Sequence, residues 1–152
     1  MSANLLDPPS AAAPSAEERF IARLTELNAN VSRWAEAADW TTRVYRKPMD
    51  GADGGRFDAP ALRLQNGPVR LLLDPAGYGD DAPAAAADLY VMPDWDQGAY
   101  LTLEDDRWSV RRVRDGLREG PPEPLDRETF LRTLEAVVSE GLPDAAARDA
   151  DA

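Results

Sequence analysis

The chain has 152 residues, a length typical of one domain, and a formal net charge of −11 at neutral pH. It contains no cysteine and no histidine, which excludes disulfides, thiolate catalysis and cysteine- or histidine-bound metals, and removes the commonest general base. The negative charge also disfavours nucleic acid as a partner, because phosphate contacts need a cationic surface.

The two ends of the chain differ in composition from its middle. Residues 1–14 and 143–152 are rich in Ala, Pro and Asp, so we interpret both as disordered tails around one domain at residues 15–142. The N-terminus has no signal-like segment, and no apolar run approaches the ~20 residues of a membrane span, so we expect a cytoplasmic protein without membrane contact. Arginine outnumbers lysine by 16 to 1, a bias typical of GC-rich bacterial coding, and Lys47 is the only lysine.

The first predicted element is a helix that begins at Ser15. Ser15-Ala-Glu-Glu18 matches a capping box, in which the Ser15 hydroxyl accepts from a first-turn N–H and the Glu18 carboxylate reaches back to the Ser15 N–H. Apolar residues then recur at spacings of three and four, namely Phe20, Leu24, Leu27, Val31, Trp34 and Ala38. This stripe predicts a helix packed on a sheet, and the alternative is a homodimer through this helix.

Six strands are predicted after this helix, at residues 40–47, 61–65, 69–73, 88–92, 99–103 and 108–113. Asn66-Gly67 indicates a tight hairpin between the second and third strands. The uninterrupted run Leu71-Leu72-Leu73 predicts that the third strand is central and covered on both faces. We predict loops at residues 48–60, 75–87 and 114–124, which are rich in Gly, Pro and Asp or Ala.

A second helix is predicted from Asp126, as its N-cap, to about Glu140, with Gly141 as a stop signal. The links between the predicted strands are mostly too short for crossover helices, so neighbouring strands must be antiparallel. The sequence therefore predicts an α+β fold. It has an N-terminal helix, a mainly antiparallel sheet of about six strands and a C-terminal helix, with both helices packed on one face of the sheet.

Charge is segregated along this predicted sheet. Nine acidic residues and no basic residue lie from Asp74 to Asp106, whereas residues 107–118 contain five arginines and one acid. Acidic turns with an aromatic anchor are typical of a surface that binds a basic protein. The predicted partner-binding residues are Asp80, Asp81, Asp94, Trp95, Asp96, Glu104, Asp105 and Asp106. We therefore expect a non-enzymatic interaction or regulatory domain, similar only in physical type to immunity proteins and chaperones.

Asp74 and Asp88 are the second candidate site. If the third and fourth strands are antiparallel neighbours, these residues meet at one end of the sheet, where two close carboxylates need a proton or a cation such as Mg²⁺. No other cofactor is expected. The pattern resembles that of the PD-(D/E)xK nucleases, although Tyr90 stands where that family has a lysine. The alternative function is therefore a divalent-metal-dependent hydrolase or nuclease.

The arginine-rich segment has two interpretations. In a strand at residues 108–113, Arg111 faces one side of the sheet and Arg112 the other. Either Arg107, Arg111, Arg112 and Arg114 form an anion-binding stripe, or acidic residues of the preceding strand neutralise them, and we favour neutralisation.

Overall fold

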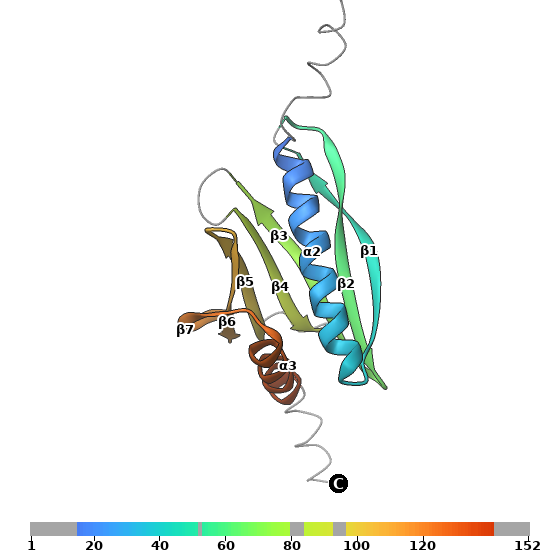
Figure 1. Cartoon of the computed structure of the whole chain (residues 1–152), viewed down its shortest axis with the longest axis vertical. Helices are drawn as coiled ribbons and strands as arrows, with labels where there is room; N and C mark the ends of the chain where they lie inside the picture. The colour runs from blue at the N-terminus through green and yellow to red at the C-terminus, as the bar shows by residue number, and fades with distance from the viewer. Residues whose placement is uncertain (1–14, 52, 80–83, 93–96, 142–152) are drawn as a thin grey trace, which may run out of the picture.

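The computed structural model describes residues 15–51, 53–79, 84–92 and 97–141. Its elements are α2 (Ala16–Ala37), β1 (Thr41–Asp50), β2 (Arg56–Asn66), β3 (Val69–Tyr78), β4 (Ala85–Val91), β5 (Gly98–Glu104), β6 (Arg107–Arg114), β7 (Leu117–Pro124) and α3 (Arg127–Gly141). Each strand pairs with the next in antiparallel fashion, so the order in the sheet is β1-β2-β3-β4-β5-β6-β7 (Figure 1). The predicted α+β architecture is confirmed, with seven strands instead of about six. The predicted tails lie outside the described residues.

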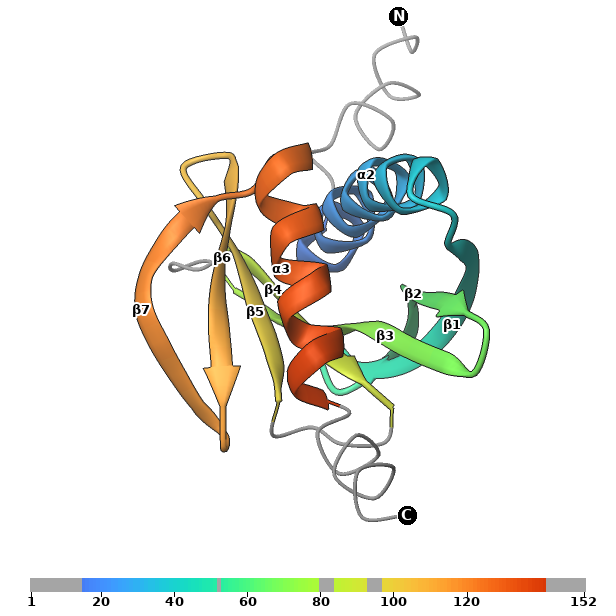
Figure 2. The same cartoon turned by 90° about the horizontal axis from the view of Figure 1, so that it is seen from below.

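Both helices lie on one face of the sheet, as predicted, and the sheet curves around them (Figure 2). α2 packs against β1, β2 and β3, and α3 packs against β4 and β5. Four residues of the predicted stripe, Phe20, Leu24, Leu27 and Val31, are buried in this interface together with Ala35. The other two, Trp34 and Ala38, are only partly buried. The side chains on which a helix-to-helix dimer would depend therefore belong to the chain's own core. None of the helices in the described ranges combines the length and apolarity needed to cross a bilayer.

The beginnings of both helices have the predicted caps. The Glu18 backbone N–H donates to Ser15 Oγ at 3.1 Å, and the Ser15 N–H donates to Glu18 Oε1 at 2.9 Å. At α3, the Thr129 N–H donates to Asp126 Oδ1 at 2.7 Å. These backbone hydrogen bonds stabilise the ionised carboxylates and lower the pKa of Glu18 and of Asp126.

The core lies between the helices and alternate residues of the strands. On the face that the helices cover, one cross-strand set consists of Leu64, Leu71 and Val91. The other core positions are likewise opposite one another on neighbouring strands. Leu73 is buried, whereas its neighbour Leu72 points to the opposite face and is half-buried. The prediction that the third strand is covered on both faces is therefore wrong, because both helices lie on the same side.

The three segments predicted as loops all contain strand. β1 and β2 pair continuously as far as Asp50 and Arg56, so only a short turn remains of the loop at residues 48–60. β3 and β4 likewise extend into residues 75–87, and β7 occupies most of residues 114–124. Pairing with a neighbouring strand overrides the local preference of Gly, Pro and Asp for turns. β7 is exposed along its whole length, so it has no apolar alternation by which to recognise it.

Candidate functional site

Neither helix covers the second face of the sheet, which we call the open face. One cross-strand row on it consists of Arg43, Arg63, Leu72, Tyr90, Gly98, Val113 and Arg118. The adjacent row consists of Asp74, Asp88, Tyr100 and Arg111. The open face therefore brings together residues from all seven strands, including both predicted metal ligands.

Asp74 and Asp88 are directly opposite each other in the β3–β4 ladder. They meet, as predicted, but inside the ladder and not at an end of the sheet, because β3 continues to Tyr78 and β4 already begins at Ala85. Lys47 Nζ lies 2.6 Å from Asp74 Oδ1, so the chain's only lysine supplies a cation to this carboxylate pair.

Two further hydrogen bonds fix this group. Lys47 Nζ donates to the Pro75 carbonyl at 2.7 Å, and the Tyr90 hydroxyl donates to Asp74 Oδ2 at 3.2 Å. Burial and the Asp74 carboxylate raise the pKa of Tyr90 to about 12, so the hydroxyl stays protonated and acts as a donor at neutral pH.

Asp88 differs from Asp74 in its surroundings. It is half-buried, and no hydrogen bond or ion pair joins its carboxylate to another described residue. Burial, followed by the nearby Asp74 carboxylate, raises the pKa of Asp88, while Arg118 and Lys47 act in the opposite direction. Asp88 is thus a carboxylate whose charge the fold only partly compensates.

Two hollows lie on either side of these carboxylates. One has a volume of about 540 Å³ and is lined by Asp88, Tyr90, Arg111, Val113, Leu117 and Arg118. The other has a volume of about 450 Å³ and is lined by Tyr45, Lys47, Arg63, Leu72, Asp74 and Met92. Each hollow combines apolar and aromatic side chains with cations. Within the described ranges, no three acidic side chains are grouped so that they could hold a metal ion together. Mg²⁺ often binds to only one or two carboxylates, so the site at Asp74 and Asp88 stays a prediction.

Five of the predicted partner-binding residues, Asp80, Asp81, Asp94, Trp95 and Asp96, lie outside the described residues. The structure describes the other three, Glu104, Asp105 and Asp106. The predicted site as a whole therefore stays a prediction.

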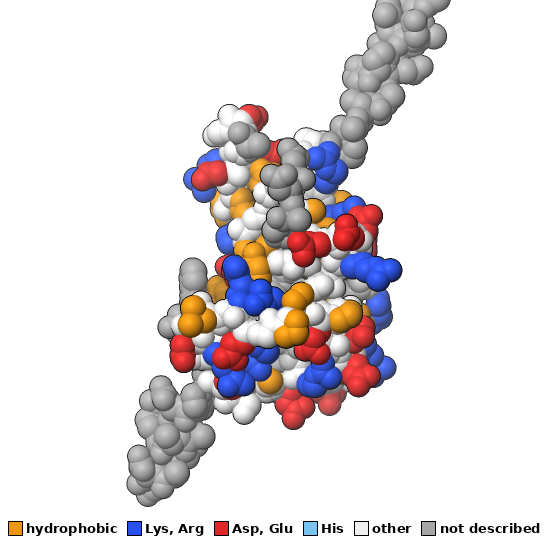
Figure 3. All heavy atoms as spheres, turned by 90° about the vertical axis from the view of Figure 1, so that its left-hand side faces the viewer, with side chains coloured by type: hydrophobic (Ala, Val, Ile, Leu, Met, Phe, Trp, Pro, Cys, Tyr) orange, Lys and Arg blue, Asp and Glu red, His pale blue; other side chains and the backbone are white. Residues whose placement is uncertain are grey.

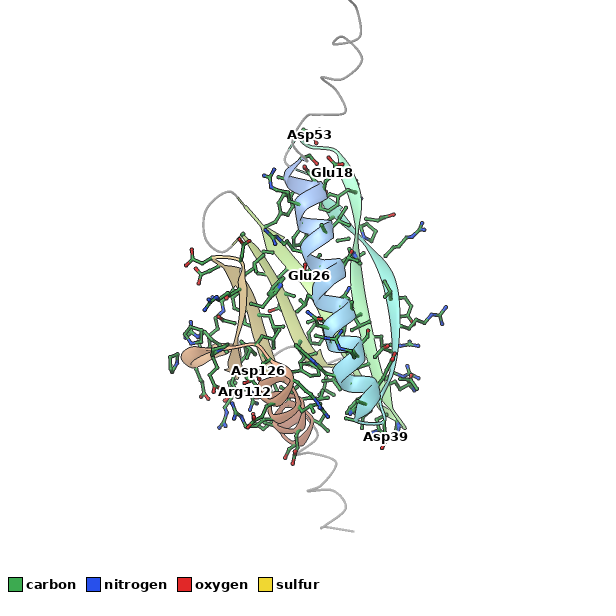
Figure 4. All side chains as sticks on the ribbon, in the orientation of Figure 1. Glu18, Glu26, Asp39, Asp53, Arg112 and Asp126 are labelled. Carbon is green, nitrogen blue, oxygen red and sulfur yellow. The ribbon has the colours of Figure 1, made fainter. Side chains whose placement is uncertain are left out.

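Glu104, Asp105 and Asp106 lie at the end of the sheet from which the β5–β6 turn leaves. Asp105 and Asp106 form this turn with positive φ angles of 53° and 60°. Asp106 Oδ1 is 2.6 Å from an Nη of Arg23 in α2, and both side chains are exposed. Figure 4 places Glu18 and Asp53 toward one end of the molecule and Asp39 at the other.

The arginines of β6 follow the predicted alternation between the two faces. Arg112 and Arg114 face the helices, where the Glu140 carboxylate of α3 accepts from both guanidinium groups, at 2.5 Å and 2.9 Å. Arg114 also pairs with Glu119 of β7 at 3.0 Å. Neutralisation is therefore observed for these two arginines, but α3 and β7 supply the acids where the preceding strand was expected to do so. Arg111 faces the open side, and its Nε donates to the Gly120 carbonyl at 2.9 Å.

Sequence reasoning missed the cations that other strands bring to the open face. The Arg118 guanidinium lies 3.7 Å from the centre of the Tyr100 ring. The guanidinium groups of Arg43 and Arg63 lie 5.3 Å and 5.0 Å from the centre of the Tyr45 ring. The alternation of Arg43, Tyr45 and Lys47 in the first strand was a signal of a polar sheet face.

The side of the molecule on which β6 and β7 lie shows acidic, basic and hydrophobic side chains interspersed (Figure 3). No protein-family model matches the chain, and neither a curated protein nor a solved structure is significantly similar to it. Function is therefore inferred from the residues and their geometry.

Proposed function

We propose that this chain is a non-enzymatic interaction domain that binds another protein through that protein's basic surface. The observation that supports it is a set of acidic residues that we call the acidic end, namely Glu17, Glu18, Asp53, Glu104, Asp105 and Asp106. Figure 4 shows Glu18 and Asp53 at one end of the molecule, and Asp106 reaches α2 through its ion pair with Arg23. These acids come from three parts of the chain, namely the first turn of α2, the β1–β2 turn and the β5–β6 turn.

The β5–β6 turn is the most distinctive part of the acidic end. A two-residue turn with positive φ at both positions favours Asn-Gly or Gly-Gly, because a side chain in the left-handed region costs conformational energy. This turn carries two aspartates instead, and both are exposed. Backbone strain that exposes the Asp105 carboxylate next to Asp106, which pairs with Arg23, supports a role in binding.

Binding of this kind has a specific physical signature. Complementary charges increase the rate of association and the specificity, while salt screens exposed charges over about 10 Å at 0.1 M ionic strength. The complex that we propose is therefore sensitive to salt. Such a surface fits a regulator that covers the basic surface of its partner. Immunity proteins and chaperones are of the same physical type.

The test is affinity capture from the source lysate with a salt gradient, which compares the wild-type chain with the Asp105→Lys/Asp106→Lys variant. We expect a basic protein that salt elutes from the wild type and that the variant does not retain. Asp39→Lys is the matched control, because Asp39 is also an exposed aspartate with positive φ, at 70°, but lies at the opposite end. The proposal is refuted if the wild-type chain captures no protein that salt elutes. It is also refuted if Asp105→Lys/Asp106→Lys captures as much of that protein as Asp39→Lys does.

A second candidate function, a divalent-metal-dependent hydrolase or nuclease, is favoured by the position of Lys47 beside Asp74 and Asp88. Two acids and one lysine then share one site, although the lysine must release Asp74 before a metal can bind there. Thermal unfolding in the presence of Mg²⁺, Mn²⁺ or Ca²⁺ tests this function, because a bound ion raises the melting temperature by mass action. The rise must disappear in Asp74→Asn, and a flat response in the wild type rejects this candidate.

A further inference from the structure

We propose that the open face is a second binding surface, which takes an extended, acidic polypeptide segment of a partner protein. This surface is distinct from the acidic end and has the opposite charge preference. The inference therefore goes beyond the proposed function and does not depend on it.

The first support is the charge of the open face. In its two rows the basic residues are Arg43, Arg63, Arg111 and Arg118, with Lys47 bonded to Asp74, and the acidic residues are Asp74 and Asp88. Five cations against two anions make these rows positive on a chain whose formal net charge is −11. Acidic residues are thus concentrated elsewhere, and this face is complementary to an anionic ligand.

The second support is that three of these guanidinium groups form no ion pair with a described carboxylate, although Arg118 lies close enough to Asp88 to act on its pKa. Among the residues that the structure describes, Arg63, Arg111 and Arg118 take part in no ion pair. Arg112 and Arg114, on the opposite face of the same sheet, both do. Unpaired guanidinium groups keep their N–H donors available for the carboxylates of a ligand.

The third support is that these guanidinium groups are held in place. Arg118 lies over the Tyr100 ring at 3.7 Å, and Arg63 lies 5.0 Å from the centre of the Tyr45 ring. Arg111 is fixed by its bond to the Gly120 carbonyl at 2.9 Å. A guanidinium group that is already ordered loses little entropy when it binds a carboxylate in a two-pronged geometry.

The arrangement of the row defines the shape of the ligand. From Arg63 on β2 to Arg118 on β7, five strand spacings span about 24 Å. The two arginines lie at the ends of this span, while Leu72, Tyr90 and Val113 lie between them. An extended segment of about seven residues has this length. The acidic residues of such a ligand belong near its two ends, where they lie away from Asp74 and Asp88. Its apolar residues belong in the middle.

The same observations favour a peptide over a nucleic acid. Bases bind to sheets by stacking on exposed aromatic rings. Here Arg118 covers a face of Tyr100, Arg43 and Arg63 flank Tyr45, and Tyr90 is only 6% exposed. The carboxylates of Asp74 and Asp88 in the middle of the surface would also repel a phosphate backbone.

The test measures fluorescence anisotropy with three labelled probes. The first is an extended peptide of about seven residues with glutamates at both ends and Val and Leu between polar residues in its middle. The second carries lysines in place of the glutamates, and the third is a single-stranded oligothymidylate. We expect the acidic peptide to bind, with an affinity that falls as salt rises, and the other two probes to bind more weakly.

Variants locate the binding on the open face. Arg63→Glu and Arg118→Glu should each raise the Kd of the acidic peptide about tenfold or more, because each replaces an attraction by a repulsion. Arg33→Glu is the matched control, since Arg33 is an exposed arginine on α2 and its guanidinium donates to the Asn30 side chain one helical turn away. Arg63→Ala and Arg118→Ala give the same comparison if a charge reversal prevents folding, which circular dichroism checks.

Three outcomes would overturn the inference. One is preferential binding of the lysine peptide or the oligothymidylate, and another is a Kd that stays unchanged in both arginine variants. The third is a dimer in sedimentation that Arg118→Glu dissociates, which would make the open face an interface between copies of this chain. The Asp105→Lys/Asp106→Lys variant must still bind the acidic peptide, so failure of the proposed function and failure of this inference are distinguishable.

Discussion

On the helix-covered face of the sheet, Arg112 and Arg114 of β6 have carboxylate partners, whereas on the open face Arg111 and Arg118 have none within the described part of the chain. Neighbouring residues of one strand thus have opposite roles, because successive side chains point to opposite faces. A count of charges along the sequence cannot separate the two roles. The comparison teaches that the net charge of this chain hides a face of the opposite sign.

The largest expected difference between the two faces concerns their leucines. Leu73→Ala should lower the free energy of unfolding by about 2–5 kcal/mol, because it leaves a cavity under the helices. Leu72→Ala should cost less than half as much, since Leu72 is only half-buried on the open face. Urea unfolding of both variants measures the difference. Equal losses would show that the open face is covered in solution.

A smaller difference is expected for the adjacent arginines. Arg112→Ala should lower the free energy of unfolding by about 1–2 kcal/mol, because Glu140, whose side chain is only 28% exposed, loses one of its partners. Arg111→Ala should change it by no more than about 0.5 kcal/mol, as is usual for surface positions. A double-mutant cycle of Arg112→Ala with Glu140→Gln measures the coupling. A loss for Arg111→Ala as large as that for Arg112→Ala would contradict the distinction between paired and unpaired arginines.

The smallest expected effect concerns the pH dependence of Asp88. Because its pKa is raised in the folded chain, ionisation of Asp88 reduces stability as the pH rises from its ordinary pKa through the raised one. Asp88→Asn removes this loss. The variant should therefore melt higher than the wild type near pH 7. The gap should shrink as the pH falls through the raised pKa and level off below the ordinary pKa of an aspartate, about 3.9. A gap that stays constant over this range would show that ionisation of Asp88 is not its cause.

The sequence contains enough information to predict the architecture. The capping residues Ser15 and Asp126 mark where the helices begin, and the Asn66-Gly67 turn fixes a hairpin. These signals are local, so they can be recognised without knowledge of the fold. β7 was missed because it is an exposed edge strand that contains Pro121 and Pro122, and its pairing with β6 outweighs the preference of these residues for loops.

The candidate sites were less predictable, because they depend on register across several strands. The meeting of Asp74 and Asp88 followed from one antiparallel pair, and it was predicted. The approach of Lys47 to Asp74 crosses from β1 over β2 to β3, so it depends on two registers at once. The stacking of Arg118 on Tyr100 likewise depends on a strand that the sequence pattern does not reveal. A one-residue slip in any of these pairings would move such side chains to the other face.

The two outermost strands share a feature that concerns how this molecule stays separate from its own copies. β1 contains Pro48, and β7 contains Pro121, Pro122 and Pro124. An outermost strand offers unpaired backbone groups on which a foreign strand can extend the sheet, and proline removes the N–H donors that such growth requires. These prolines therefore protect the rims of a broad sheet from fibre-like self-assembly.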